Sequence, residues 1–209
     1  MDKYQETFST WNKVADLYQE KFMNLDIYNS TYDYFCDQII EQNPKILEVG
    51  TGPGNITQYL LQKRPDFHIA GIDVSENMVA LAQENNPKAN FKVMDARDID
   101  TLNSVFDGIV CGFCLPYLSS SDCKKFIEDC HHLLLDDGLL YISFVEGEED
   151  KSGYQSNSKG DRIYFYYHLL ESIADSLRIL YFKVLRVFHI NYPKGDGTNE
   201  IHTIIVAKK

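Results

Sequence analysis

Apolar side chains recur at helical spacing over residues 4–43, which predicts that this segment is helical. The first predicted helix carries one apolar stripe, whose members are Trp11, Val14, Ala15, Tyr18 and Phe22. A second helix is predicted over residues 28–41. Asn43-Pro44 follows it, and proline disfavours a helical conformation at the residue before it. The helical segment is therefore expected to end there.

Beyond residue 44 the pattern alternates between short apolar runs and amphipathic segments. The apolar runs predict buried strands over 45–50, 67–73, 91–95, 106–112 and 139–145. The amphipathic segments predict helices over 55–64, 75–85 and 119–135, with a short helix or loop over 97–105. Strands that alternate with helices predict a parallel sheet with right-handed crossovers.

The alternation stops after Val145. Residues 146–161 are rich in Gly, Ser, Asn, Lys and acids, which predicts a mobile loop. A helix is expected over 166–180. Two β-rich runs, 182–192 and 200–207, flank Pro193-Lys194-Gly195-Asp196-Gly197, which is typical of a terminal hairpin. The sheet is thus expected to be parallel at first and antiparallel at its end, within a single domain.

The composition and charge of the chain limit the kinds of partner that we expect it to bind. The chain has 209 residues, 44% apolar and 24% charged, as expected of one globular domain. Its formal charge of −11 offers no general footprint for nucleic acid or for an anionic membrane. No apolar stretch approaches the ~18 residues of a membrane span, and the N-terminus lacks a secretory signal. We expect a cytoplasmic monomer or homodimer whose five cysteines are buried thiols.

The segment between the first strand and the next helix is rich in glycine. Gly50, Gly52 and Gly54 stand where the loops of a parallel sheet bind ligands, at the carboxyl ends of the strands. Asp73 ends the second predicted strand, 19 residues after Gly54. An acid in that place can accept hydrogen bonds from both hydroxyls of a ribose. Strand, loop, helix and acid together predict a nucleoside-containing ligand.

The glycine spacing separates two kinds of ligand. A dinucleotide loop reads G-x-G-x-x-G and leaves amides free for a pyrophosphate, whereas this loop reads G-x-G-x-G. Glu48 precedes it, and a carboxylate there would repel a phosphate and suit a cationic ligand. No Gly-Lys-Ser/Thr follows, so the loop is not that of a nucleoside triphosphatase.

Residues 46–145 resemble the class I S-adenosylmethionine-dependent methyltransferases, whose first motif is E/D-x-G-x-G-x-G. Later motifs match in order, at Gly71–Ser75 with Met78, Asp95-Ala96, Phe106–Val110 and Leu133–Phe144. The resemblance implies an α/β fold with a doubly wound, seven-stranded, mostly parallel sheet and an antiparallel final strand. It also implies a single domain in which 1–43 form an N-terminal helical lid, 44–145 bind the cofactor, and 146–209 supply the substrate side.

The resemblance implies a role for each matching residue. Gly50, Thr51, Gly52 and Gly54 form the loop around the methionine part of the cofactor, and Glu48 supports that loop and the positive charge indirectly. Asp73 holds the ribose. Val74 and Met78 form an apolar wall for adenine, and Asp95 and Ala96 form hydrogen bonds to its ring. Near the amino-acid end, the lining comes from Cys111, Gly112 and Phe113, and Tyr18 makes the lid contact.

The implied activity is methyl transfer from S-adenosylmethionine to a small molecule, leaving S-adenosylhomocysteine. The sulfonium is already reactive, so the protein mainly orients the acceptor and excludes water. An oxygen acceptor also needs a nearby base. His168, after the predicted loop, is the candidate; the alternative is a histidine among core aromatics. The aromatics of 154–192 either line an acceptor pocket or belong to the core.

Two other functions remain open at this stage. The chain is alternatively a cofactor-binding protein without turnover, or an NAD-dependent oxidoreductase, against which the glycine spacing counts. Cys111 and Cys114 spell C-x-x-C, but no helix is predicted to begin until near Ser119 and no second tight pair follows. No metal or redox role is therefore expected.

Overall fold

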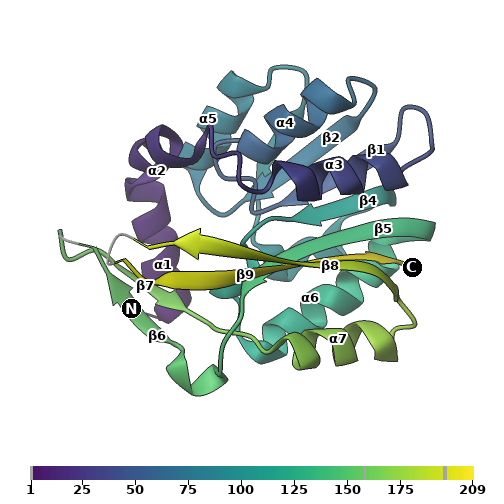
Figure 1. Ribbon diagram of the computed structural model, residues 1–209. Coiled ribbons are helices and arrows are strands. Elements are labelled where there is room, and N and C mark those ends of the chain that lie inside the picture. The colour runs from purple at the N-terminus through teal and green to yellow at the C-terminus, as the bar shows by residue number, and fades with distance from the viewer. Residues whose placement is uncertain (1, 158, 195–196) are drawn as a thin grey trace.

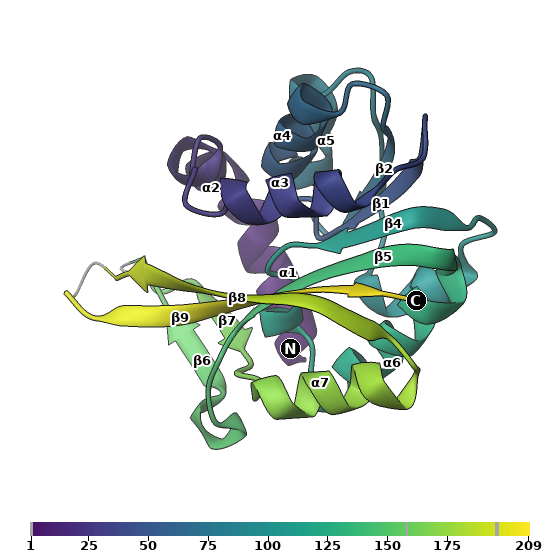
Figure 2. The same ribbon diagram turned by 45° about the vertical axis from the view of Figure 1, so that its right-hand side comes forward.

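The computed structural model describes residues 2–157, 159–194 and 197–209. Its main sheet has seven strands in the order β3-β2-β1-β4-β5-β9-β8 (Figures 1 and 2). The strands are β1 (Lys45–Val49), β2 (His68–Asp73), β3 (Asn90–Val93), β4 (Phe106–Cys111), β5 (Leu134–Val145), β8 (Lys183–Pro193) and β9 (Asn199–Lys208). Strands β1 to β5 are parallel, and β9 is antiparallel to both β5 and β8. The predicted mostly parallel sheet with an antiparallel final strand is confirmed.

Helices cover both faces of the sheet (Figures 1 and 2). They are α1 (Lys3–Lys13), α2 (Ala15–Phe22), α3 (Asn29–Gln38), α4 (Asn55–Lys63), α5 (Glu76–Asn85), α6 (Ser120–Leu133) and α7 (Leu170–Ile179). Short 3₁₀ helices span Ala96–Thr101, Leu115–Tyr117 and Glu149–Lys151. Helices α3, α4 and α5 lie on one face, and α6 and α7 lie on the other. Within the described ranges, no helix is long and apolar enough to cross a bilayer.

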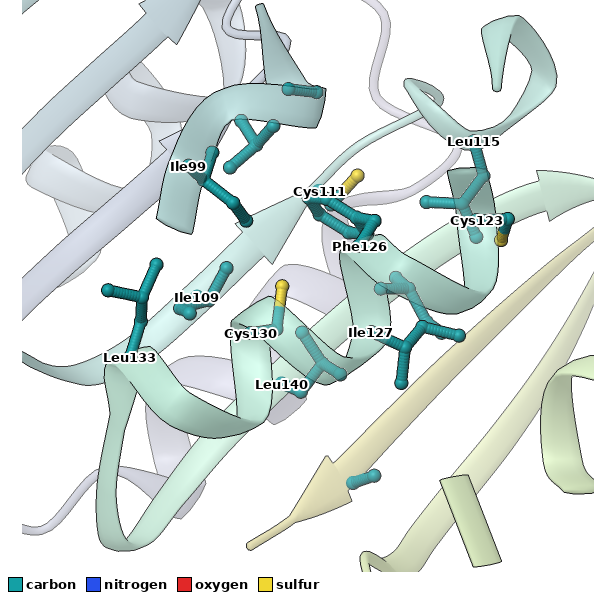
Figure 3. Close-up of a cluster of buried hydrophobic side chains, with 14 of the residues drawn as sticks. Ile99, Ile109, Cys111, Leu115, Cys123, Phe126, Ile127, Cys130, Leu133 and Leu140 are labelled. Atoms are coloured by element: carbon teal, nitrogen blue, oxygen red, sulfur yellow. The ribbon is translucent and has the colours of Figure 1, made fainter. Parts of the chain in front are cut away.

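Alternating side chains of the central strands supply two separate cores. On β1, Ile46 packs with the α3 and α4 side and Leu47 packs with the α6 and α7 side. Successive side chains of a strand point to opposite faces, so a strand buried on both faces must be apolar throughout. Figure 3 shows the core on the α6 and α7 side, which includes Phe126 and Ile127 of α6 and Ile109 of β4.

The order of the strands places a switch point at the centre of the sheet. Strand β1 pairs with β2 on one side and with β4 on the other, so the chain leaves the carboxyl ends of β1 and β4 in opposite directions. Ligands of open α/β sheets bind in the crevice that this divergence opens. The loops that follow β1 and β4 therefore define where a site is expected.

The predicted loop at 146–161 is only partly correct. The segment contains a 3₁₀ turn at Glu149–Lys151 and strand β6 (Gly153–Ser156), which pairs with β7 (Arg162–Phe165) just beyond it, and α7 starts only at Leu170. The hairpin is held by α1, which is remote in sequence: Thr7 Oγ1 accepts a hydrogen bond from Tyr164 N at 2.9 Å. Arg162 Nε also donates to Glu6 Oε1 at 2.7 Å. Pairing with a remote helix is not visible in local composition.

The N-terminal helices are shorter than predicted. A break at Val14 separates α1 from α2, and α3 ends at Gln38 rather than near residue 41. The terminal hairpin is present as the β8–β9 pair. Gly195 and Asp196, part of the predicted turn, lie outside the described residues.

Candidate functional site

The loop between β1 and α4 takes a left-handed backbone at each of its three glycines. Gly50, Gly52 and Gly54 have φ of 70°, 54° and 80°. This conformation costs other residues about 1–2 kcal/mol. A side chain at Gly54 would also collide with the amide of Asn86, which donates to Gly54 O at 2.9 Å. The G-x-G-x-G pattern is thus required by backbone shape and by close packing.

Asp73 stands at the end of β2 and faces the glycine loop. Its Oδ2 accepts from Gly52 N and its Oδ1 from Ser75 N, both at 2.9 Å. Burial raises the pKa of this carboxyl, and the amide hydrogen bonds partly offset that effect. Each carboxylate oxygen can accept a second hydrogen bond. The group is therefore fixed in place while it keeps acceptor capacity for a ligand.

Glu48 lies fully buried on β1, beneath the same loop. Its Oε2 accepts a hydrogen bond from the Thr57 hydroxyl of α4. Burial raises the pKa of Glu48 from 4.5 to about 7, against the effect of that hydrogen bond. Glu48 lines neither of the cavities described below, so any effect on a bound cation acts through the loop.

A cavity of about 100 Å³ lies beside this loop, above the switch point. Most of the residues predicted from the sequence line it. They are Tyr18, Gly50, Gly52, Asp73, Val74, Met78, Asp95, Ala96, Gly112 and Phe113. The motifs that follow β1, β2, β3 and β4 are thus brought together around one space.

Asp95 is already engaged by a neighbouring cation. Its carboxylate accepts two hydrogen bonds from Arg97 Nε, both at 3.0 Å, and one from the Arg97 amide at 2.9 Å. The Arg97 guanidinium in turn lies 4.0 Å from the centre of the Tyr4 ring. These contacts orient the carboxyl and link it to α1. No motif in the sequence pointed to Arg97.

The first helix closes one side of the cavity. Thr7, Phe8 and Trp11 of α1 line it together with Tyr18 of α2. Asn12 anchors α1 to the start of α5, because its Oδ1 accepts from Ser75 Oγ at 2.9 Å and from Asn77 N at 3.0 Å. Figure 1 shows α1 between α5 and the β6–β7 hairpin. The N-terminal helices thus cover the carboxyl ends of the strands.

A second, larger cavity of about 290 Å³ adjoins the first. The two share walls at Trp11, Tyr18, Gly50, Gly52, Gly112, Phe113 and Tyr117. Beyond these, the second cavity is lined by side chains from remote elements. They include Tyr28 before α3, Phe165 of β7, Tyr192 of β8 and His202 of β9. Thr51, predicted in the glycine loop, also lines this cavity.

Four of the predicted residues line neither cavity: Glu48, Gly54, Cys111 and His168. Cys111 is fully buried, with its side chain among apolar neighbours in Figure 3, and burial raises the pKa of its thiol. His168 is 5% exposed, and its Nε2 lies 3.0 Å from Leu115 O. That backbone contact, rather than a ligand, occupies the imidazole.

His202 lines the second cavity, although no sequence motif pointed to it. The alternation of β9 was a usable signal. Residues 202, 204 and 206 share one face of the strand, and Ile204 and Val206 pack in the core beneath α3 and α4. His202 thus continues an apolar row to the strand end where the cavity lies. Its pKa is lowered to about 4 by burial, so the ring is neutral at pH 7.

Phe113 lines both cavities, and its backbone has a conformation that phenylalanine rarely adopts. Its φ is 57°, and its amide donates to Ser143 Oγ at 2.8 Å. The ring lies 5.0 Å from that of Tyr28 and 4.8 Å from that of His202, between centroids. Strained backbone of this kind is often found at functional sites.

Comparison with known proteins agrees with this geometry. The family model of the methyltransferase domain matches residues 46–138. The chain is 31% identical over 124 residues to the uncharacterized methyltransferase YdaC of Bacillus subtilis, covering 58% of this chain and 67% of YdaC. It is 31% identical over 105 residues to the demethylmenaquinone methyltransferase of Thermotoga maritima, covering 50% of this chain and 45% of that enzyme. The chain thus spans about half the length of some curated relatives that it matches.

Solved structures share the fold at low sequence identity. The magnesium protoporphyrin IX methyltransferase of Synechocystis PCC 6803, crystallised with S-adenosylhomocysteine, has a TM-score of 0.72 at 17% identity, and the match covers 100% of both chains. Fold, glycine loop and sequence matches define one class of protein. The chain belongs to the class I S-adenosylmethionine-dependent methyltransferase family.

Proposed function

We propose that this protein is an S-adenosylmethionine-dependent methyltransferase that acts on a small molecule. The observation that carries the proposal is the pair of adjoining cavities, which meet at Gly50, Gly52 and Gly112. The first cavity lies beside the glycine loop and Asp73 of β2, and many of the side chains that line the second cavity are aromatic. A methyl group must pass between two molecules held in contact, and this arrangement offers one space for each.

In this proposal the cofactor binds at the first cavity, and its methionine part extends along the glycine loop to the wall shared with the second cavity. Asp73 accepts hydrogen bonds from the ribose, Val74 and Met78 pack against adenine, and Asp95 and the Ala96 amide bind the adenine edge. The loop of Gly50, Thr51, Gly52 and Gly54 surrounds the methionine part, with Cys111 behind it and Gly112 and Phe113 beside it. The related fold of the Synechocystis enzyme, which holds S-adenosylhomocysteine, supports this assignment.

Three segments would divide the work. Residues 1–43 act as the lid, with Trp11 and Tyr18 on both cavities. Residues 44–145 bind the cofactor, and residues 146–209 supply the far wall of the acceptor space. In-line displacement at the sulfonium carbon then needs mainly orientation of the acceptor and exclusion of water. The aromatic walls and the lid serve both purposes, the orientation of the acceptor and the exclusion of water.

The assignment of Asp73 is tested by calorimetry with S-adenosylhomocysteine. Asp73→Ala should weaken binding at least tenfold, about 1.4 kcal/mol, because two ribose hydroxyls lose their acceptor. Asp175→Ala is the control, since that carboxylate lies on α7, is 45% exposed and lines neither cavity. Unchanged affinity in a folded Asp73→Ala protein would refute the ribose contact. Binding of NAD with no binding of S-adenosylmethionine or S-adenosylhomocysteine would refute the proposed function itself.

Turnover is tested separately. Transfer of a labelled methyl group to a small-molecule extract is the expected result. Tight cofactor binding without any transfer across such a screen would instead indicate a cofactor-binding protein without activity.

A further inference from the structure

The walls of the second cavity carry little charge. Aromatic side chains, among them Trp11, Tyr28, Phe165 and Tyr192, form much of the lining, and Thr51, Asn55 and Gln155 add neutral polar groups. Among the described lining residues, Glu200 is the only one with a formal charge at pH 7, because His202 is neutral. Among the described residues, no Lys or Arg lines the cavity, so the protein offers no basic side chain to offset the desolvation cost of an anionic acceptor. The cavity therefore favours an uncharged acceptor.

The size and shape of the cavity favour a flat acceptor. An apolar cavity of about 150 Å³ accommodates a benzene ring. The second cavity is about 290 Å³, so one or two fused rings fit. Two of its aromatic groups are already stacked: the rings of Tyr192 and His202 are 4.6 Å apart and inclined by 10°. Flat walls of this kind match a planar ring system.

A hydrogen-bonded pair lies in the wall of the same cavity. Tyr28 Oη and His202 Nδ1 are 2.6 Å apart, and both side chains are buried. The other ring nitrogen, Nε2, lies 3.9 Å from Glu200 Oε2. A carboxylate at that side favours the tautomer with its proton on Nε2. His202 Nδ1 then accepts from the Tyr28 hydroxyl, whose oxygen keeps lone pairs for a further donor.

The surroundings keep this pair uncharged. The titratable groups around it are Tyr18 of α2, Tyr141 of β5, Tyr192 of β8 and Glu200 of β9. Glu200 is shared with Lys194, whose Nζ donates to Oε1 at 2.9 Å. Burial lowers the pKa of His202 and raises that of Tyr28, so the neutral forms of both dominate at pH 7. Neutral His202 has a lone pair available, which a proton acceptor requires.

We propose that the second cavity binds an uncharged, flat acceptor with a ring hydroxyl, and that Tyr28 and His202 accept its proton during methyl transfer. This inference rests on the proposed function. The acceptor oxygen forms a bond to the methyl carbon as the bond from sulfur breaks, and the electron pair of that bond stays on sulfur. The hydroxyl proton passes to Tyr28 Oη while the Tyr28 proton passes to His202 Nδ1. Glu200 is the positioning residue that stabilises the resulting imidazolium.

A weak base suffices for this step. As the new bond to carbon forms, the acceptor oxygen becomes positively polarised, and its proton becomes far more acidic than that of a free phenol. The transfer therefore runs downhill to an imidazole even though burial holds the pKa of His202 near about 4. Methyl transfer and proton transfer are coupled, so the acceptor need not ionise beforehand.

The acceptor class is tested with two probes that share one ring system. Naphthol and naphthoate share the same rings and differ in charge. Each is titrated by calorimetry into the protein saturated with S-adenosylhomocysteine. Naphthol should bind at least tenfold more tightly than naphthoate. Equal or reversed affinities, or no binding of naphthol, would overturn the inference. If S-adenosylhomocysteine itself fails to bind, the proposed function fails instead, so the two failures are distinguishable.

The proton acceptors are tested by methylation of naphthol. His202→Asn and Tyr28→Phe should each lower kcat about 100-fold, with affinity for S-adenosylhomocysteine within about twofold of wild type. His189→Asn is the matched control: it makes the same change on the neighbouring strand β8, and His189 lines neither cavity. It should leave kcat unchanged.

The pH profile separates a proton acceptor from a merely structural residue. Wild-type kcat should stay flat from about pH 6 to 9, because His202 is neutral throughout. In His202→Asn and Tyr28→Phe, kcat should rise with pH, because only acceptor that is already ionised reacts. Circular dichroism checks that each variant folds. A kcat within threefold of wild type in folded His202→Asn and Tyr28→Phe, a flat profile in both, or binding of naphthol without methylation would overturn the assignment.

Discussion

The two adjoining cavities are assembled in different ways. The first is built mainly by loops that directly follow β1, β2, β3 and β4, so these parts of its wall are fixed by the strand before them, and α1 and α2 close one side. The second collects side chains from α1, from the start of α3, and from β7, β8 and β9. The first thus depends on local backbone geometry and the second on how remote elements pack. Cofactor recognition is expected to tolerate changes in the terminal hairpin, and acceptor recognition is not.

The largest effect on stability is expected beneath the first cavity, at Glu48. Burial raises its pKa from 4.5 to about 7. The pKa of this carboxyl is higher in the folded than in the unfolded protein. Its contribution to the free energy of unfolding is therefore fully present below pH 4.5 and is lost as pH rises through about 7. The loss is on the order of 3 kcal/mol. The difference in unfolding free energy between wild type and Glu48→Gln, measured by urea unfolding of the ligand-free proteins over this range, should show the loss, because the opposite titration of His202 is common to both.

The control for Glu48 is Asp175→Asn, which changes an exposed carboxylate on α7. It should leave the pH dependence of the unfolding free energy as in wild type. If the difference in unfolding free energy between wild type and Glu48→Gln did not change between these pH values, burial of the Glu48 carboxyl would not have the predicted effect.

A smaller loss is expected from Gly54→Ala. Its φ of 80° is left-handed, and the added methyl group meets the Asn86 amide. We expect destabilisation of about 2 kcal/mol and weaker binding of S-adenosylhomocysteine. Gly160→Ala is the control, because Gly160 has a φ of 82° with nothing within 4 Å of the added carbon. The difference between the two variants in chemical unfolding measures the collision; equal losses would show that backbone strain alone matters.

The smallest effect is expected at His168, which lies outside both cavities. His168→Asn removes the contact of Nε2 with Leu115 O and should cost about 1 kcal/mol of unfolding free energy. Affinity for S-adenosylhomocysteine and kcat should not change. A large loss of kcat with normal stability would contradict the placement of His168 and would restore it as a candidate base.

The sequence predicted the first cavity well because its determinants are local. The glycines at 50, 52 and 54 follow a strand, and Asp73 ends the next one, so their approach follows from parallel strand order alone. The mostly parallel sheet and the antiparallel β9 were likewise readable from hydrophobic periodicity. The contact by which Arg97 orients Asp95 was not predictable, because a local charge pair leaves no periodic pattern in the sequence.

The second cavity was not predictable in the same way. The β6–β7 hairpin has a polar, glycine-containing sequence and is held through Thr7 and Arg162 against α1. His202 and Tyr28 meet across 174 positions of sequence, and no local pattern joins them. The two histidines illustrate this limit: proximity to a predicted loop pointed to His168, which lines neither cavity, whereas the face of β9 places His202 in the wall of the second.

The most direct test of the two-cavity account is a crystal structure with S-adenosylhomocysteine bound. The account predicts the ribose against Asp73, adenine between Met78 and Asp95, and the sulfur at the shared wall near Gly112. The adenosine part should stay out of the cavity of Tyr28 and His202. Adenosine in that cavity, or a ribose away from Asp73, would contradict the account.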